Sequence, residues 1–320
     1  MSIRVGVVGL GVMGRTHLRL LRAMPGVSVV AVADVAPAAL RAAGPVTTYD
    51  DPLALVGEAE VDAVLVASSD AAHAAVLLAC LAKELPVLCE KPLTTTVVDA
   101  QRVVDREVAI GRRLVQVGFM RRFDPAFRAV RDAVQDGAVG RPAVVHTVHR
   151  NPVSAYPFSP SVLVTNSASH DVDLVRWTTG DEIAEVSCQL APSPDAQFAS
   201  VLLRLTTRGG VLASTELTYG PGFRYDVRCE VVGRGGSVQT PSVRDGHEGG
   251  HDGGGDWVGR FDDAYRLQDA DWLSFADPPG VGATAWDGLV NAVVLAAAGQ
   301  ALAQDRPVTV DLPPRPTLYA

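Results

Sequence analysis

The chain has 320 residues, which is enough for roughly two domains, and 48% of them are hydrophobic, as expected for a globular protein with a sizeable core. Its formal net charge of −8 and the lack of a long Lys/Arg run argue against a DNA or RNA partner. Every apolar run meets a charge or a turn signal before it reaches about 18 residues, so no membrane span is expected.

The N-terminal part of the chain alternates between predicted strands and helices. Short apolar, β-branched stretches are typical of strands that are buried on both faces of a sheet. Such stretches lie at 3–8, 27–33, 61–67, 87–89 and 114–117, and helices are predicted between Gly14 and about Pro25, at 71–82 and at 97–110. The alternation predicts βαβ units and therefore a doubly wound parallel sheet of the α/β class.

The pattern changes near residue 120. Beyond a predicted helix at about 125–136, the strands become longer and alternate between polar and apolar residues, at 143–148, 183–190, 198–206, 211–218 and 225–232. Two more helices are predicted at about 260–275 and 283–303. This pattern predicts an open, mostly antiparallel sheet with one face toward solvent or a partner. The sequence thus predicts an α/β domain at 1–120 and an α+β domain at 121–320.

A G-x-G-x-x-G motif, formed by Gly9, Gly11 and Gly14, separates the first predicted strand from the first helix. The first glycine permits a tight turn, the second lets a pyrophosphate approach the backbone, and the third lets helix and strand pack closely. Free N–H groups at the start of the helix can hold phosphates. The whole loop, including Val12 and Met13, is therefore predicted to bind a dinucleotide.

The second predicted strand ends at an aspartate, Asp34, twenty positions beyond Gly14. A carboxylate there would accept hydrogen bonds from the adenosine ribose and repel a 2′-phosphate. No Arg or Lys follows before Arg41, so NAD is favoured over NADP. A structural turn followed by a strand-end aspartate is the alternative interpretation.

Two further segments carry candidate catalytic groups. Lys91, in CEKPL, follows a strand that should be central, at the sheet edge where open parallel sheets bind ligands. Beside a cationic nicotinamide ring its pKa would be lowered, so it could take a proton from an alcohol; a solvated surface charge is the alternative. A predicted helix over 165–177 places Asn166 and His170 on one stripe with apolar residues. Spacing alone leaves open whether His170 is a core residue or a catalyst.

The sequence HEGGH at 247–251 matches the H-E-x-x-H pattern of zinc hydrolases. In those enzymes a helix places both histidines on one face, where they bind the metal. The surrounding stretch, 245–256, is rich in glycine, and each glycine costs about 1 kcal/mol in a helix interior relative to alanine. A surface loop without a metal site is therefore expected, and a zinc hydrolase is the least favoured function.

The cysteines and the N-terminal segment bear on the compartment. The four cysteines include no C-x-x-C pair, and three of them lie in apolar or strand-like runs, which favours free thiols in a reducing compartment. The N-terminal segment has glycine-rich spacing and no small-residue cleavage site, so it is interpreted as a strand rather than a signal peptide. A cytoplasmic protein is expected.

These segments together resemble the Gfo/Idh/MocA oxidoreductases, and within them the inositol dehydrogenases, over nearly the whole chain. The likeness is carried by GVVGLGVMGRTHL, ASSDAAHAAVLLACL, CEKPL, QVGFMRRFDPAF, VHRNP, NSASHDVDLVRW, YDVRCEVVG and DWVGRFDDAYRLQDADWLSF. The EKP segment is shared across the family, whereas QVGFMRR, HRNP and the W-x-x-RF-x-x-AY stretch are more specific to the inositol branch. The resemblance implies a Rossmann domain followed by an α+β domain, NAD as cofactor, a polyol or sugar substrate, and a homo-oligomer, dimer or tetramer, with contacts through the open sheet.

The resemblance also assigns roles to single residues. Lys91 and His170 match the family's catalytic lysine and histidine. Arg121 and Tyr225 match polyol contacts. The positions that match the cofactor cleft are Ser68, His73 and Glu90, beside Lys91 itself.

Asn166 departs from the family, in which an aspartate commonly lies four residues before the histidine. An amide can hold a hydroxyl group but cannot relay a proton or balance a charge. Losing the anion is expected to favour neutral Lys91 while weakening the proton route. The predicted function is oxidation of a cyclic polyol or sugar, with myo-inositol favoured, by NAD+. A non-catalytic NAD(H)-binding sensor or partner protein on the same scaffold is the alternative.

Overall fold

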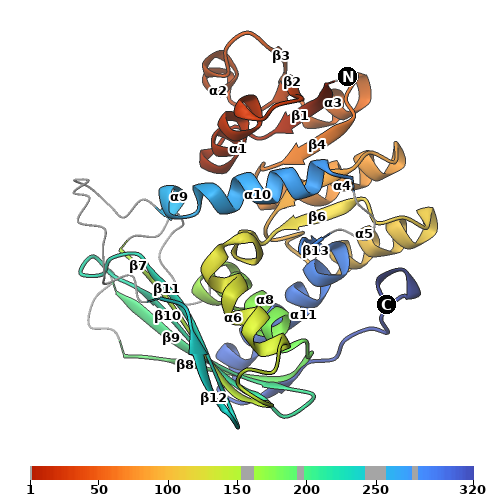
Figure 1. Cartoon of the computed structure of the whole chain (residues 1–320). Coiled ribbons are helices and arrows are strands. Elements are labelled where there is room, and N and C mark those ends of the chain that lie inside the picture. The colour runs from red at the N-terminus through yellow and green to blue at the C-terminus, as the bar shows by residue number, and fades with distance from the viewer. Residues whose placement is uncertain (1, 153–161, 193–197, 242–256, 276–279) are drawn as a thin grey trace. The chain divides into compact units, whose positions relative to one another are not determined.

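The computed structural model describes residues 2–152, 162–192, 198–241, 257–275 and 280–320. The chain divides into two compact units, each built around one seven-stranded sheet (Figure 1). The first unit combines Met1–Phe123, Asp262–Ala292 and Pro313–Ala320, and the second combines Asp124–Phe261 and Val293–Leu312.

The first unit is a doubly wound α/β domain whose sheet has the order β13-β6-β5-β4-β1-β2-β3. All neighbouring strands are parallel except β13, which pairs antiparallel with β6. The strand order reverses between β1 and β4, and open α/β sheets bind ligands at the carboxyl ends of such strands. The strands are β1 (Ile3–Val8), β2 (Val27–Ala33), β3 (Thr47–Tyr49), β4 (Ala63–Val66), β5 (Val87–Glu90), β6 (Val115–Gly118) and β13 (Ala283–Thr284). The helices are α1 (Val12–Ala23), α2 (Pro37–Ala42), α3 (Pro52–Glu58), α4 (His73–Ala82), α5 (Val97–Ile110) and α10 (Asp262–Leu273), with single helical turns η1 (Asp70–Ala72), η2 (Met120–Phe123) and η4 (Thr317–Tyr319).

Local sequence signals explain where these elements begin and end. Every residue of β4 and β5 is buried, which agrees with their unbroken apolar or near-apolar sequences. Helix α5 begins at Thr96, whose hydroxyl accepts a hydrogen bond from the N–H of Asp99, and it ends at Gly111 in the left-handed conformation. The central strands and their flanking helices therefore form a rigid support for the loops at the carboxyl edge.

The second unit is an open sheet with the order β12-β11-β7-β10-β9-β8-β14, in which only β7 and β10 are parallel neighbours. Buried and exposed residues alternate along β9, which is the pattern of a sheet with one covered face. Helices α6 and α8 pack against that sheet (Figure 1). The strands are β7 (Pro142–Asn151), β8 (Ile183–Leu190), β9 (Ala199–Thr207), β10 (Leu212–Tyr219), β11 (Asp226–Gly233), β12 (Gly236–Gln239) and β14 (Val308–Thr309), and the helices are α6 (Pro125–Gln135), α8 (Ala168–Thr179) and α9 (Trp257–Arg260).

The division of the chain differs from a single cut at residue 120. Residues 262–292 and 313–320, which the sequence analysis placed in the second domain, belong to the first unit. Long-range contacts explain the difference: β13 pairs with β6, Asp269 of α10 bonds to His17 of α1, and Tyr319 bonds to Glu107 of α5. These pairings join residues far apart in sequence, so local patterns could not indicate them.

One helix, α11 (Ala285–Gln304), is long and apolar enough to cross a membrane, but two-thirds of its most apolar stretch is buried inside the protein. Core helices of globular proteins give the same pattern.

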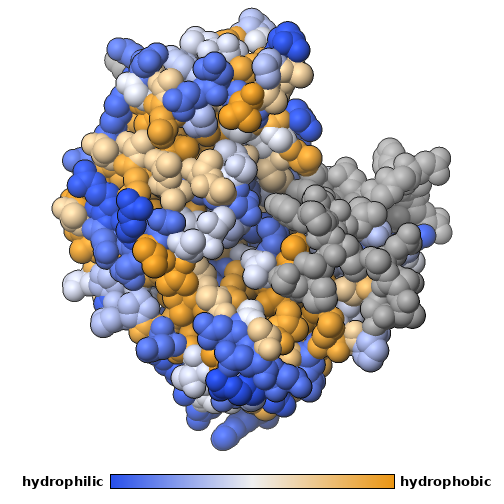
Figure 2. Space-filling view, turned by 180° about the vertical axis from the view of Figure 1, so that it is seen from behind, coloured by the Kyte–Doolittle hydropathy of each residue, from blue (hydrophilic) through white to orange (hydrophobic). Residues whose placement is uncertain are grey.

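Apolar and hydrophilic residues are interspersed in small patches over the face of the molecule that Figure 2 shows. All four cysteines are free and buried, which confirms the prediction of free thiols.

Candidate functional site

The glycine loop lies between the end of β1 and the start of α1, and each glycine has a separate steric reason. Gly9 adopts a positive φ of +89°, and a Cβ there would lie 2.4 Å from the carbonyl oxygen of Ala67. A Cβ on Gly14 would lie 1.8 Å from the carbonyl oxygen of Gly9. A Cβ on Gly11 would meet no atom within 4 Å, so the chain itself does not require glycine there. The open space at Gly11 fits a phosphate group that approaches the backbone.

Helix α1 begins at this loop with features suited to an anion. Its N-cap is Gly11, which offers no side-chain hydrogen bond to the first turn, and that turn carries no acidic residue. The exposed N–H groups and the positive end of the helix dipole would therefore be available to a pyrophosphate. Arg15 bonds to the carbonyl of Leu10 at 2.8 Å and adds a positive charge beside the loop.

Asp34 follows the end of β2 and is tied to the glycine loop. Its Oδ2 accepts a hydrogen bond from the N–H of Leu10 at 2.6 Å, and its Oδ1 accepts one from the N–H of Ala36 at 2.7 Å. Each oxygen keeps a further lone pair that could accept a ribose hydroxyl. The next residue, Val35, is 80% exposed and brings no positive charge. This environment fits NAD better than its 2′-phosphorylated form.

His73 joins the loops that follow β4 and β5. Its Nδ1 lies 2.8 Å from the carbonyl oxygen of Pro92, and its Nε2 lies 3.2 Å from that of Ser68. The ring is 1% exposed. The hydroxyl of Ser68 is covered and has no hydrogen-bond partner among the described residues, so it is a candidate donor to a bound ligand. His73 thus supports the shape of this edge of the sheet.

Lys91 begins the loop after β5, at the carboxyl edge of the sheet, and is partly buried. The peptide bond between Lys91 and Pro92 is cis. Burial lowers the pKa of the Lys91 amine, the charges of Glu90 and Asp70 oppose this, and the charge of Arg121 lowers it further. A lysine with a depressed pKa at such an edge is suited to accept a proton. Arg121, in η2, is 2% exposed and belongs to the same unit.

A buried triad that the sequence analysis did not identify adjoins Lys91. The imidazole of His17 contacts the carboxylates of Asp269 and Glu90, and all three residues belong to the first unit. The only available signals were a histidine in the second turn of the glycine-loop helix and an aspartate in the helix predicted at about 260–275. Neither indicates the other, because 252 positions separate them.

Asn166 and His170 lie in the second unit, on two different kinds of helical turn. The sequence analysis predicted one helix over 165–177, but Leu163–Ser167 forms a π-helical turn, η3, before α8 begins at Ala168. Both side chains are partly buried. Such π-turns often occur at functional sites, because the extra residue re-aims nearby side chains.

Tyr225, immediately before β11, lies beside a polar network of the second unit. Its ring packs edge-on against His149 at 6.2 Å between centroids. His149 bonds through Nδ1 to Asp171 of α8 at 3.1 Å and accepts at Nε2 from Asn151 at 3.2 Å. The network continues from Asn151 through Tyr219 to Ser167 of the π-turn. This network connects β7, β10 and α8. The HRNP segment, which contains His149 and Asn151, was its only signal in the sequence.

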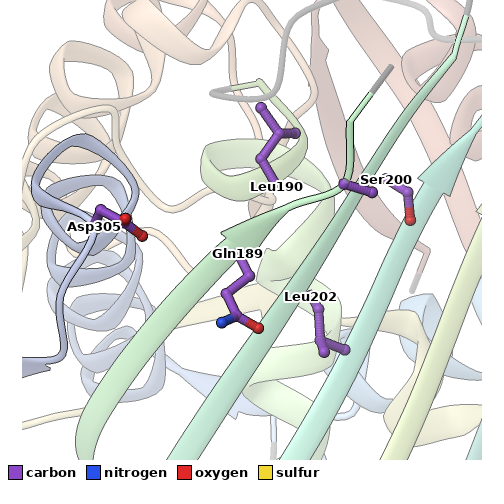
Figure 3. A pocket seen from close by; sticks show the side chains of 6 residues that line it. Gln189, Leu190, Ser200, Leu202 and Asp305 are labelled. Carbon is purple, nitrogen blue, oxygen red and sulfur yellow. The ribbon is translucent and has the colours of Figure 1, made fainter. Parts of the chain in front are cut away.

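The H-E-x-x-H match at 247–251 lies outside the described residues, and within the described part of the chain no group of three or more His, Cys, Asp or Glu side chains has an arrangement that could hold a metal ion. A hollow in the second unit is lined by Gln189, Leu190, Ala191, Ser200, Leu202 and Asp305 (Figure 3). None of the predicted site residues lines it.

Comparison with known proteins identifies relatives over the full length. Residues 3–119 match the GFO_IDH_MocA description, "Oxidoreductase family, NAD-binding Rossmann fold", and residues 127–239 match the GFO/IDH/MocA C-terminal domain. Inositol 2-dehydrogenase 1 of Saccharopolyspora erythraea is 42% identical, with 100% of this chain and 99% of the relative covered. Inositol 2-dehydrogenase/D-chiro-inositol 3-dehydrogenase of Shouchella clausii is 36% identical, with 100% and 97% covered. The crystal structure of myo-inositol dehydrogenase from Lactobacillus casei in complex with NAD(H) and myo-inositol is 31% identical, with a TM-score of 0.91 and 100% of both chains covered.

Proposed function

Because this chain belongs to the Gfo/Idh/MocA oxidoreductase family, we propose that it oxidises a cyclic polyol, with myo-inositol as the first substrate to test. It is an NAD-dependent dehydrogenase with a Rossmann domain. The observation that carries the proposal is the carboxyl edge of the first sheet, where the glycine loop, Asp34 and a lysine of depressed pKa lie on one unit. Relatives named for inositol oxidation match along the whole chain.

The residues divide the chemistry between them. NAD+, when bound, supplies the acceptor for the hydride. Neutral Lys91 accepts the hydroxyl proton of the substrate, and His170 assists by holding that hydroxyl group. Arg121, Asn166 and Tyr225 bind further hydroxyl groups of the substrate. Their side chains carry hydrogen-bond donors or acceptors, so these hydroxyl groups keep hydrogen-bond partners when they leave water.

The residues of the first unit other than Lys91 position the cofactor. The glycine loop, with Val12 and Met13, holds the pyrophosphate, and Asp34 accepts the ribose hydroxyls. Ser68 and Glu90 line the same edge, and His73 supports it. In this proposal the first unit is the cofactor-binding domain, and the second unit is the substrate-binding and oligomerisation domain.

The test is an NADH-formation screen over inositols and aldoses, with Lys91→Ala as the comparison. Loss of a positioned general base should lower kcat by about 10²- to 10⁴-fold, while NADH binding, followed by its fluorescence, should persist. Turnover that survives in Lys91→Ala would exclude Lys91 as the base. Cofactor binding with turnover on no substrate would instead favour a non-catalytic NAD(H)-binding sensor, for which Asn166 is the supporting feature.

We further propose that the chain forms a cytoplasmic homo-oligomer, a dimer or tetramer, through the second sheet. Two leucines on the same face of the neighbouring strands β9 and β10, Leu202 and Leu212, are 43% and 49% exposed. Exposed apolar residues on one sheet suit a partner copy. Leu202→Glu should lower the mass measured by light scattering, whereas a monomeric wild type would refute the proposal. With a net charge of −8, neither nucleic acid nor a membrane is proposed as a partner.

A further inference from the structure

His17 connects three elements of the first unit from a fully buried position. It lies on α1, and its side chain is 0% exposed. Its Nδ1 lies 2.8 and 3.0 Å from the two carboxylate oxygens of Asp269 on α10, and its Nε2 lies 3.0 Å from Oε1 of Glu90 at the end of β5. Tyr265, one turn before Asp269, packs edge-on against the same ring at 5.5 Å between centroids.

This geometry requires an unusual charge state. A neutral imidazole has one donor and one acceptor, but both ring nitrogens of His17 face carboxyl oxygens, so with both carboxylates ionised both nitrogens donate. Burial alone would lower the pKa of His17, but the charge and hydrogen bonds of Asp269, and then of Glu90, raise it to about 10. His17 is therefore a cation between two anions at neutral pH.

Glu90 transmits this arrangement to Lys91. Its other oxygen, Oε2, accepts a hydrogen bond from the backbone N–H of Lys91 at 3.2 Å. Gly118 leaves just enough room for the carboxylate, because a Cβ there would lie 3.0 Å from the Glu90 side chain. The charged groups that act on the Lys91 amine are Glu90, Asp70 of η1 and Arg121 of η2. His17 is the partner that compensates Glu90, the anion with the larger effect on Lys91.

We propose that His17 is a positioning residue, which fixes the Glu90 carboxylate beside Lys91 and offsets its negative charge. The inference rests on the proposed role of Lys91 as the base. Without the His17 cation, Glu90 would hold the Lys91 proton more tightly, and the base would work only at higher pH. Without Asp269, the uncompensated His17 cation would have the opposite effect.

The experiment compares wild type with His17→Gln, Asp269→Asn and the double variant. Wild type carries one net negative charge on the triad, His17→Gln carries two, Asp269→Asn carries none, and the double variant returns to one. The acid limb of kcat/KM should move up by about one pH unit in His17→Gln and down by about one in Asp269→Asn, since a neighbouring charge shifts a pKa by about 1 to 3 units. The double variant should return toward wild type.

A second measurement follows the Lys91 amine directly. The sequence contains two lysines, Lys83 and Lys91, so competitive acetylation read by mass spectrometry reports the protonation of Lys91 with Lys83 as internal reference. Labelling needs no turnover, so it tests the inference even if no polyol is oxidised, whereas an inactive wild type would count against the proposed function alone.

The outcomes are distinct. Opposite shifts in the two single variants, with recovery in the double variant, support the proposal. A purely structural role would lower thermal stability without opposite shifts, and unchanged Lys91 titration in both single variants would overturn the proposal. If His17→Gln fails to fold, Asp269→Asn decides: a downward shift supports the proposal, and no shift overturns it.

Discussion

Replacing Asp34 by asparagine should weaken NAD+ binding and reduce the discrimination against NADP+. The carboxylate already accepts the backbone N–H groups of Leu10 and Ala36, at 2.6 and 2.7 Å, so it is held in place before a ribose arrives. Hydrogen bonds to a charged acceptor contribute about 1.5–3 kcal/mol each, against about 0.5–1.5 for neutral pairs. Two ribose hydroxyls would therefore lose about 2–3 kcal/mol together, or roughly 30- to 150-fold in the KM for NAD+.

The same change should favour NADP+ for a separate reason. Two unit charges 4 Å apart repel by about 4 kcal/mol at the effective dielectric of a protein surface. Removing the Asp34 charge relieves part of this repulsion from a 2′-phosphate, so the NAD+/NADP+ ratio of kcat/KM should fall by at least about 100-fold. Adding Val35→Arg should lower it further, because Val35 is 80% exposed and an arginine there could reach the phosphate.

The assay is steady-state kinetics with both cofactors, supported by NADH and NADPH fluorescence titrations that need no turnover. Asp51→Asn is the matched control, because Asp51 also accepts a backbone N–H, that of Leu53 at 2.9 Å, at a helix start of the same unit. An equal effect of Asp34→Asn on both cofactors would refute the reasoning. A similar loss in Asp51→Asn would show that general destabilisation causes it.

Three further predictions, made with four substitutions, test other parts of the structure. Gly11→Ala should leave the melting temperature nearly unchanged but weaken NADH binding. Gly14→Ala should lower the melting temperature, because its Cβ would lie 1.8 Å from the Gly9 carbonyl oxygen. Equal melting temperatures for the two variants would contradict this. Burial raises the pKa of Glu107 to about 7. The contribution of the protonated carboxyl to the free energy of unfolding is therefore complete below about pH 4.5, and about 3 kcal/mol of it is lost as the pH rises through 7. Urea unfolding should therefore show Glu107→Gln gaining stability relative to wild type between pH 5 and pH 8, and a constant difference would disprove it. Under the proposed function, Asn166→Asp should raise the pH of the acid limb of the rate profile, because an anion beside the base would stabilise its protonated form; an unchanged profile would remove the proposed effect of the amide.

Local patterns predicted the elements whose residues interact with near neighbours in sequence. Most strands of both sheets and helices α5 and α6 were expected close to their observed bounds, because apolar spacing and capping residues act over a few positions. The short elements α2, α3 and β3 were not predicted, since each has seven residues or fewer and β3 is polar. The edge strands β12, β13 and β14 were missed for the same reason.

The candidate site divides in the same way. The glycine loop and Asp34 could be predicted because a strand, a turn and a helix start follow one another directly in sequence. The π-turn at Leu163–Ser167 could not, since it spans five residues, too few for a periodicity that would distinguish it from an α-helix. The His17 triad depends on α10 packing against α1, and the periodicity of a sequence does not indicate which distant segments pack together.

The cofactor-binding unit is therefore not separable at residue 120, although its dinucleotide motif ends before that point. A fragment that stopped there would keep His17 and Glu90 but lose Asp269, and breaking a buried ion pair by removing one partner costs about 3–5 kcal/mol. It would also lose Tyr319, which donates a hydrogen bond to buried Glu107, and β13, which covers the edge of β6. The C-terminal segments thus complete the domain that begins the chain, and they hold in place the carboxylate beside Lys91.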